Sequence, residues 1–223
     1  MTNWLNPVKK GIIHNILDVI YPEECPICGR KPSIASFCEN CAKIYLSGQR
    51  ATVSNEIIAE KLTTIFAIDN FNPQIKKIIH DLKYNSIEKQ AVDIMRIGIT
   101  PFYDELKAAD LITSVPLHPF RFLRRGYNQA EILAKTASEE LQIPYEKLLL
   151  RTRYNLTQTK KKKKNRKIAV AGLFAMRKKK NIADKTIIIV DDVCTTTATI
   201  SECAKVLYAA GAKKVIVLCL ARV

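Results

Sequence analysis

The chain has 223 residues, 48% of them apolar, which is enough for one sizeable domain with a small appendage. Its net charge is +15, but thirteen basic and no acidic residues lie between positions 151 and 180, so the rest is nearly neutral. The chain has no run of about 18 apolar residues, so no transmembrane helix is expected. The N-terminus does not have the pattern of a secretion signal. Seven cysteines, an odd number, argue against a disulfide scaffold and favour a cytoplasmic setting.

Residues 3–20 carry apolar side chains at helical spacing, among them Trp4, Val8 and Ile12. This pattern predicts an amphipathic helix. Its apolar face would either pack against the rest of the protein or bind a membrane surface or a partner. The second possibility leaves open a peripheral position at the inner membrane face.

Two CxxC pairs follow, formed by Cys25 with Cys28 and by Cys38 with Cys41, and nine residues separate them. Each pair can present two thiolates to one point, so the two pairs together predict a tetrahedral Zn²⁺ site. Four thiolates leave no open coordination position, which indicates a structural metal whose binding contributes folding energy. Disulfides or a redox CxxC are the alternatives. Cys203 and Cys219 are expected to be small core residues.

The next segments alternate between strand and helix patterns. Residues 42–63 are expected to be a connector with helical tendency, and residues 65–71 a strand. Pro73 begins a helix that ends at Lys83 and Tyr84, and a second helix covers residues 87–99. A buried strand is expected at residues 111–115.

A polar loop follows that strand and contains Arg121, Arg124 and Arg125 before a helix begins near Ala130. Guanidinium groups bind phosphate oxygens in pairs, so these arginines are candidates for a pyrophosphate loop. The alternative is a solvated basic turn.

The basic charge is concentrated after residue 151. Its candidate nucleic-acid-binding residues are Lys160, Lys161, Lys162, Lys163, Lys164, Arg166 and Lys167. So many like charges predict a flexible loop, which would be a lid over a ligand, a sequence-independent nucleic-acid contact or simply a solvated loop. Tyr154 could stack on a base.

Four branched apolar residues at positions 187–190 predict a strand buried on both faces of a parallel sheet. Asp191 and Asp192 follow, and hydroxyl residues then lead into a helical pattern that Gly211 ends. The N-terminus of such a helix binds anions. The stretch therefore predicts a phosphate cradle beside two carboxylates that face sugar hydroxyls or hydrated Mg²⁺. The alternative is an ordinary strand that ends in a polar turn. A last buried strand is expected at residues 215–220.

This stretch resembles the signature with which type I phosphoribosyltransferases bind phosphoribosyl pyrophosphate (PRPP). The resemblance implies that Asp191 and Asp192 are the catalytic carboxylates, which hold the ribose hydroxyls with or without Mg²⁺. The implied PRPP- and phosphate-binding residues are Asp191, Asp192, Val193, Cys194, Thr195, Thr196, Thr197, Ala198 and Thr199. The family usually has Gly at the position of Thr197, where Gly tolerates a positive φ that a β-branched residue does not.

Four parts of the chain together resemble the ComF family of competence-associated proteins (ComFC), to which GntX proteins are similar. They are the four cysteines, the segment VPLHPFRFLRRGYNQAEILA, the segment LLLRTRYNLTQTKKKKKNRKIAVAGLF and the acid pair. The family's Arg-Gly-aromatic-Asn-Gln element is carried by residues 125–129, and its Thr-Gln and following Arg by Thr157, Gln158 and Arg166. Ala169 stands where the family commonly has Asn.

The resemblance implies an α/β fold with a type I phosphoribosyltransferase-like, mainly parallel sheet and flanking helices. A small zinc-binding domain precedes it. Residues 1–55 would form the N-terminal helix and zinc-binding domain, and residues 56–223 the phosphoribosyltransferase-like domain.

Three functions follow from these patterns. The first, and the one we favour, is a competence protein that handles single-stranded DNA during natural transformation, with PRPP or another sugar phosphate as ligand. The second is an active phosphoribosyltransferase of nucleotide or base salvage. The third is an interaction module that recruits a DNA-translocating helicase, a partner that the resemblance implies.

Overall fold

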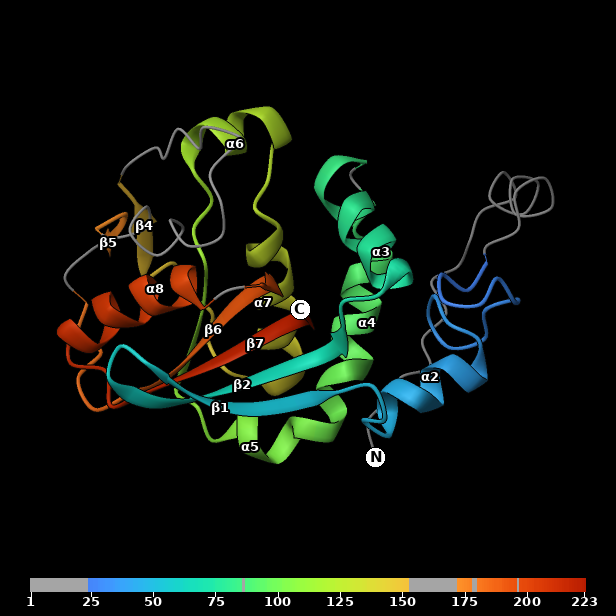
Figure 1. The fold of residues 1–223 in the computed structure, drawn as a ribbon, viewed down its shortest axis with the longest axis horizontal. Helices are drawn as coiled ribbons and strands as arrows, with labels where there is room; N and C mark the ends of the chain where they lie inside the picture. Colours follow the sequence, from blue (N-terminus) through green and yellow to red (C-terminus); the bar gives the residue numbers. More distant parts are fainter. Residues whose placement is uncertain (1–23, 86, 153–171, 178–179, 196) are drawn as a thin grey trace.

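The computed structural model describes residues 24–85, 87–152, 172–177, 180–195 and 197–223 (Figure 1). The helix predicted over residues 3–20 lies outside the described residues. So do the lysine-rich run at 160–167, the family positions Thr157 and Gln158, and Thr196.

A five-stranded sheet forms the centre of the molecule, with the order β1-β2-β7-β6-β3. Four of its strands are parallel, and β1 at one edge is antiparallel to β2. The sheet is mainly parallel, as the sequence predicted. The strands are β1 (Thr52–Ile58), β2 (Lys61–Asn70), β3 (Leu111–Ser114), β6 (Thr186–Cys194) and β7 (Lys214–Arg222).

Both faces of the sheet are covered, because neighbouring residues of each buried strand enter different cores. In β6, Ile188 and Val190 join one hydrophobic cluster, whereas Ile187 and Ile189 join the other. The first cluster contains side chains of α2 (Glu39–Leu46), α3 (Pro73–Tyr84), α4 (Lys89–Ile99), η1 (Thr100–Phe102), α5 (Tyr103–Lys107) and α7 (Gln129–Leu141). The second contains side chains of α8 (Ala198–Ala209) and of a small sheet formed by β4 (Leu149–Arg151) and β5 (Phe174–Met176). The flanking helices confirm the predicted fold class.

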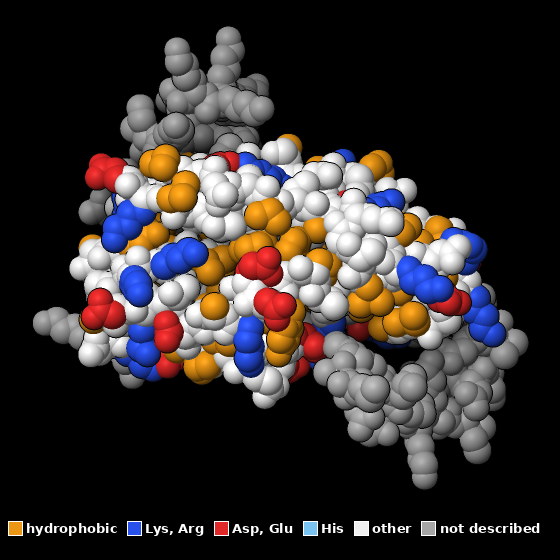
Figure 2. Space-filling model, turned by 90° about the horizontal axis from the view of Figure 1, so that it is seen from below, with side chains coloured by type: hydrophobic (Ala, Val, Ile, Leu, Met, Phe, Trp, Pro, Cys, Tyr) orange, Lys and Arg blue, Asp and Glu red, His pale blue; other side chains and the backbone are white. Residues whose placement is uncertain are grey.

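The edge hairpin β1–β2 corrects one prediction. The connector expected over residues 42–63 is wrong, because it contains the end of α2 and all of β1. The tight turn between the strands is formed by Ala59 and Glu60, both with positive φ, where Asn-Gly would be the usual signal. The hairpin exposes Val53, Ile57 and Leu62. Figure 2 shows the face of the molecule seen from below, where apolar side chains gather among scattered charges of both signs.

The four-cysteine segment packs against the first core. Phe37 and Tyr45 are buried in the same cluster as α4. Ser36 Oγ donates to Asp93 of α4 over 2.5 Å, and the Tyr45 hydroxyl donates to Asp69 of β2 over 2.7 Å. Strand β1 spans residue 55, the expected domain boundary, so the division into two domains stays a prediction. In the described part of the chain, no helix is long and apolar enough to cross a membrane.

Close packing between α4 and β2 leads to a first prediction. A Cβ atom at Gly98 would overlap the side chain of Ile68. Gly98→Ala is therefore expected to lower the free energy of unfolding by about 1–3 kcal/mol, although alanine normally favours a helix by about 1 kcal/mol. Thermal melts measure the effect. In an Ile68→Ala background, the same substitution should be neutral or stabilising, and an unchanged melting temperature for Gly98→Ala alone would contradict the packing.

Candidate functional site

The acid pair lies at the carboxyl end of β6. This strand is buried through Val190, and Asp191 and Asp192 are then half-buried. The Asp191 carboxylate accepts the backbone N–H of Asp192 over 2.9 Å. Asp192 forms an ion pair with Lys83, which comes from the C-terminal end of α3. Burial and the neighbouring charge of Asp192 raise the pKa of Asp191 well above its usual value, while Lys83 acts in the opposite direction.

The raised pKa of Asp191 gives a second prediction. The folded protein holds a proton on Asp191 more tightly than the unfolded chain does, so this residue's contribution to stability falls as pH rises from about 4 towards the folded pKa. Asp191→Asn removes this loss. The melting temperature of the variant minus that of the wild type is therefore expected to increase from pH 4 to pH 8. A constant difference over this range would show that Asp191 titrates normally.

The arginine loop starts at the carboxyl end of β3, directly beside β6, since the Val115 N–H donates to the Val190 carbonyl over 3.0 Å. The polar loop expected here contains a short helix, α6 (Pro119–Arg125). His118 caps its start by accepting from Phe120 N, and Gly126 ends it with a φ of +81°. The Asn128 side chain then caps α7 and donates to the Val115 carbonyl over 3.0 Å. These caps hold the loop next to the acid pair.

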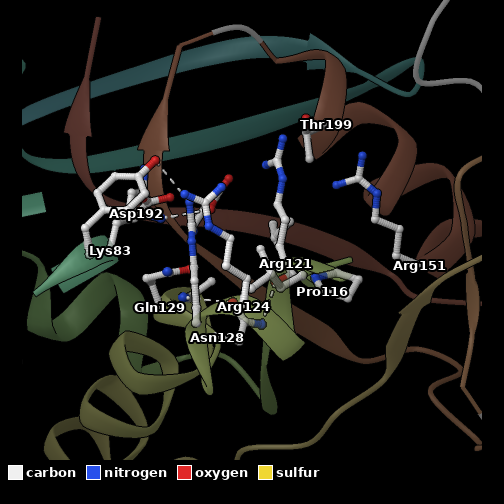
Figure 3. A pocket seen from close by; sticks show the side chains of 15 residues that line it. Lys83, Pro116, Arg121, Arg124, Asn128, Gln129, Arg151, Asp192 and Thr199 are labelled. Carbon is white, nitrogen blue, oxygen red and sulfur yellow. Dashed lines mark hydrogen bonds and ion pairs between the residues drawn. The ribbon is translucent and has the colours of Figure 1, made fainter. Parts of the chain in front are cut away.

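The two strand ends enclose a cavity of about 460 Å³ (Figure 3). The predicted arginines Arg121, Arg124 and Arg125 line it, as do both aspartates and Thr199. Lys83 and Arg151 add two further cations. Five basic and two acidic side chains face the same space, and one of the acids is already paired with Lys83. The cavity is therefore suited to an anion that also presents groups to a carboxylate.

Two buried polar groups in this cavity lack partners among the described residues. Gln129 is only 3% exposed, and its Nε2 has no hydrogen-bond acceptor. The Arg151 Nε is likewise buried without an acceptor. Burial, followed by the nearby charge of Arg121, lowers the pKa of Arg151. Because buried donors are almost always paired in folded proteins, both groups point to a ligand with oxygen acceptors.

Among the described residues, no side chain caps the N-terminus of α8, and the first backbone N–H groups of a helix have no partner within the helix. Thr197 has a φ of −71°, a conformation that β-branched residues adopt without strain. The difference from the family's usual Gly therefore costs no backbone strain in this conformation. Burial raises the pKa of Cys194 to about 11, so its thiol is protonated at neutral pH. Cys203 and Cys219 are fully buried core residues, as predicted.

Three charged or aromatic lining residues were not among the candidates from sequence: Lys83 and Tyr84 from α3, and Arg151 from β4. In the sequence, Lys83 and Tyr84 stood at the end of a predicted helix, and Arg151 stood at the start of the basic stretch. The sequence signal was the position of Lys83 and Tyr84 at the end of an amphipathic helix, but nothing in it indicated a carboxylate partner so far along the chain.

The four cysteines of the predicted metal site come together. The sulfur atoms of Cys25, Cys28, Cys38 and Cys41 all lie within 4.8 Å of one another, and a tetrahedral Zn–S₄ centre needs sulfurs about 3.8 Å apart. The turn after the first pair requires Gly29, whose φ is +73° and whose N–H donates to the Cys25 carbonyl. Hydrogen bonding from Arg30 lowers the pKa of Cys28 to about 6. This cluster could bind a metal such as zinc.

The chain is similar in sequence to several known proteins. The family described as "Phosphoribosyl transferase domain" matches residues 123–223. The chain is 31% identical to "Competence protein F" of Haemophilus influenzae over 205 residues, which cover 88% of this chain and 85% of that protein. It is 30% identical to "DNA utilization protein YhgH" of Escherichia coli, with 71% of each chain covered. It is 25% identical to "Competence protein ComFC" of Bacillus subtilis, with 84% of this chain and 72% of that protein covered.

Proposed function

Because the chain belongs to the ComF family of competence proteins, we propose that it handles single-stranded DNA in the cytoplasm during natural transformation and binds PRPP in its cavity. The observation that supports the ligand most directly is the meeting of an acid pair, the N-terminus of α8 and three arginines at the ends of two adjacent parallel strands. Ligands of open α/β sheets bind at such strand ends.

Each part of PRPP has a candidate partner in the cavity. Asp191 and Asp192 would accept the ribose hydroxyls, with or without Mg²⁺. The N-terminus of α8 and the loop at residues 195–199 would donate to the 5′-phosphate. Arg121, Arg124 and Arg125 would neutralise the pyrophosphate. The unpartnered Gln129 amide supplies one more donor for a ligand oxygen.

The proposed DNA contact gives a third prediction. The lysines at positions 160–164 would bind phosphates and release counterions, so the affinity for an oligonucleotide should fall steeply with salt. Changing all five to serine is expected to flatten the slope of log K against log salt by up to about 3.5, at about 0.7 per lost contact. Fluorescence anisotropy between 50 and 300 mM salt measures this slope.

Lys213 and Lys214 are a matched control, because both are exposed at the opposite, amino-terminal end of β7. Lys213→Ser with Lys214→Ser should leave the slope unchanged. If the five-lysine variant binds DNA as the wild type does, the lysine-rich run is not the DNA contact.

An active phosphoribosyltransferase is the alternative function, and the excess of cations in the cavity favours it. Transfer of ribose-5-phosphate from PRPP to a nitrogen base releases pyrophosphate, and positioned cations stabilise the charge of that leaving group. Calorimetry with PRPP and Mg²⁺, followed by a pyrophosphate-release assay with a panel of bases, separates the two functions. Binding without turnover supports a non-catalytic ligand, and turnover with one base supports the enzyme. A helicase partner is proposed from the family alone.

A further inference from the structure

The helix α6 has an unusual surface for its position at the cavity. It contributes no buried residue, and its three large apolar side chains are all exposed: Phe120 at 60%, Phe122 at 46% and Leu123 at 82%. The arginines at positions 121, 124 and 125 share another side of the helix and line the cavity. Figure 3 shows Arg121 and Arg124 extending into it. The helix thus combines phosphate-binding groups with aromatic rings.

Two of the five cations in the cavity have no acidic partner among the described residues. Among the described residues, neither Arg121 nor Arg124 has a carboxylate partner within 4.0 Å, and Arg121 lies near enough to Arg151 to lower its pKa. Like charges held together in one cavity favour a ligand with a concentrated negative charge.

A further ring stands at the rim. Tyr84, at the end of α3, is 56% exposed and also lines the cavity. The Arg125 guanidinium lies over its ring at 5.0 Å from the centroid and donates to its hydroxyl over 3.3 Å. Aromatic rings together with arginines are what proteins use to stack the bases of single strands. PRPP has no aromatic ring, so the proposed contacts with PRPP leave the rings of α6 and Tyr84 without a stacking partner.

We propose that the cavity also accepts the 5′-phosphorylated end of a DNA single strand, with the terminal phosphate among the arginines and the first bases stacked on Phe122 and Tyr84. The proposal rests on the proposed function and names a second ligand of the same cavity. At about 460 Å³ the cavity has the size of a pocket for one small molecule. A terminal phosphate carries about −1.5 to −2 charges, more than an internal phosphate does, which suits the excess of cations.

Fluorescence anisotropy with oligothymidine that carries either a 5′-phosphate or a 5′-hydroxyl tests this inference. The full-length protein should prefer the phosphorylated strand at least tenfold, and PRPP should displace that strand. Phe122→Ala should weaken its binding roughly tenfold, whereas Phe122→Trp should preserve it. Leu123→Ala, which removes a more exposed apolar side chain without a ring, is the matched control and should have no effect. Arg121→Gln should abolish the preference for the phosphate.

The outcomes separate this inference from the proposed function. Equal affinity for both strands, with a steep salt dependence, would overturn end recognition and leave the DNA-handling function in place. Binding of neither strand would exclude the DNA-handling function as well. A Phe122→Ala variant that binds DNA normally but changes its oligomeric state in light scattering would show that α6 is a protein contact, and would also overturn the inference.

Discussion

Replacing Asp191 and Asp192 together by asparagine is expected to weaken PRPP binding by about 10- to 100-fold, while binding of inorganic pyrophosphate stays unchanged or tightens. The opposite responses have one physical cause. A hydrogen bond to a charged acceptor contributes about 1.5–3 kcal/mol and one to a neutral acceptor about 0.5–1.5 kcal/mol. Exchanging each carboxylate for an amide oxygen therefore weakens the partners of the ribose hydroxyls by roughly 1 kcal/mol each. Pyrophosphate has no hydroxyls, and it meets a more positive cavity once the acids are neutral. Calorimetry with both ligands measures the two affinities.

The sign of the PRPP response decides between two kinds of cavity. A purely electrostatic anion site would bind PRPP more tightly after the substitution, because all five cations remain. A site that holds the sugar would bind it more weakly. Tighter binding of both ligands would therefore contradict the proposed role of the acid pair. Asp192→Asn alone would also release Lys83 from its ion pair, so Asp191→Asn is the cleaner single variant.

Removing the proposed metal from the four-cysteine cluster is expected to have the largest effect on stability. Structural zinc contributes about 10–16 kcal/mol in isolated finger peptides, which is comparable to the whole stability of a typical domain. Cys38→Ser with Cys41→Ser should abolish metal binding and lower the melting temperature by more than about 10 °C. Metal analysis and thermal melts with and without a chelator measure the two effects.

Cys203→Ala is the control for this experiment, because Cys203 is fully buried in α8 and far from the cluster in sequence. That variant should keep one metal equivalent per chain. The damage from metal loss should extend beyond the cluster, since Phe37 and Tyr45 pack in the same core as α4. If the wild-type protein contains no metal and melts at the same temperature with and without a chelator, a structural metal is excluded here.

The sequence by itself determined the features whose residues are contiguous or regularly spaced. The strand of residues 187–190 is apolar throughout because both its faces are covered, and such a run is readable without a structure. The two CxxC pairs predicted the sulfur cluster because each short spacing already brings two thiols together. The arginines at 121, 124 and 125 were candidates for a pyrophosphate loop because guanidinium groups pair with phosphate oxygens. They line one cavity with the acid pair because the parallel strands β3 and β6 end at the same edge of the sheet.

Only the tertiary structure decided which distant side chains complete the cavity. Lys83 reaches Asp192 because the chain packs α3 beside the carboxyl ends of the parallel strands, a placement that its own helical pattern does not encode. Arg151 faces the cavity from the small sheet β4–β5, which covers the second face. Strand β1 was missed because its hairpin turn uses Ala59 and Glu60 at positive φ instead of Asn-Gly. Local spacing specifies individual helices and strands, whereas the pairing of charges between them depends on the strand order of the sheet.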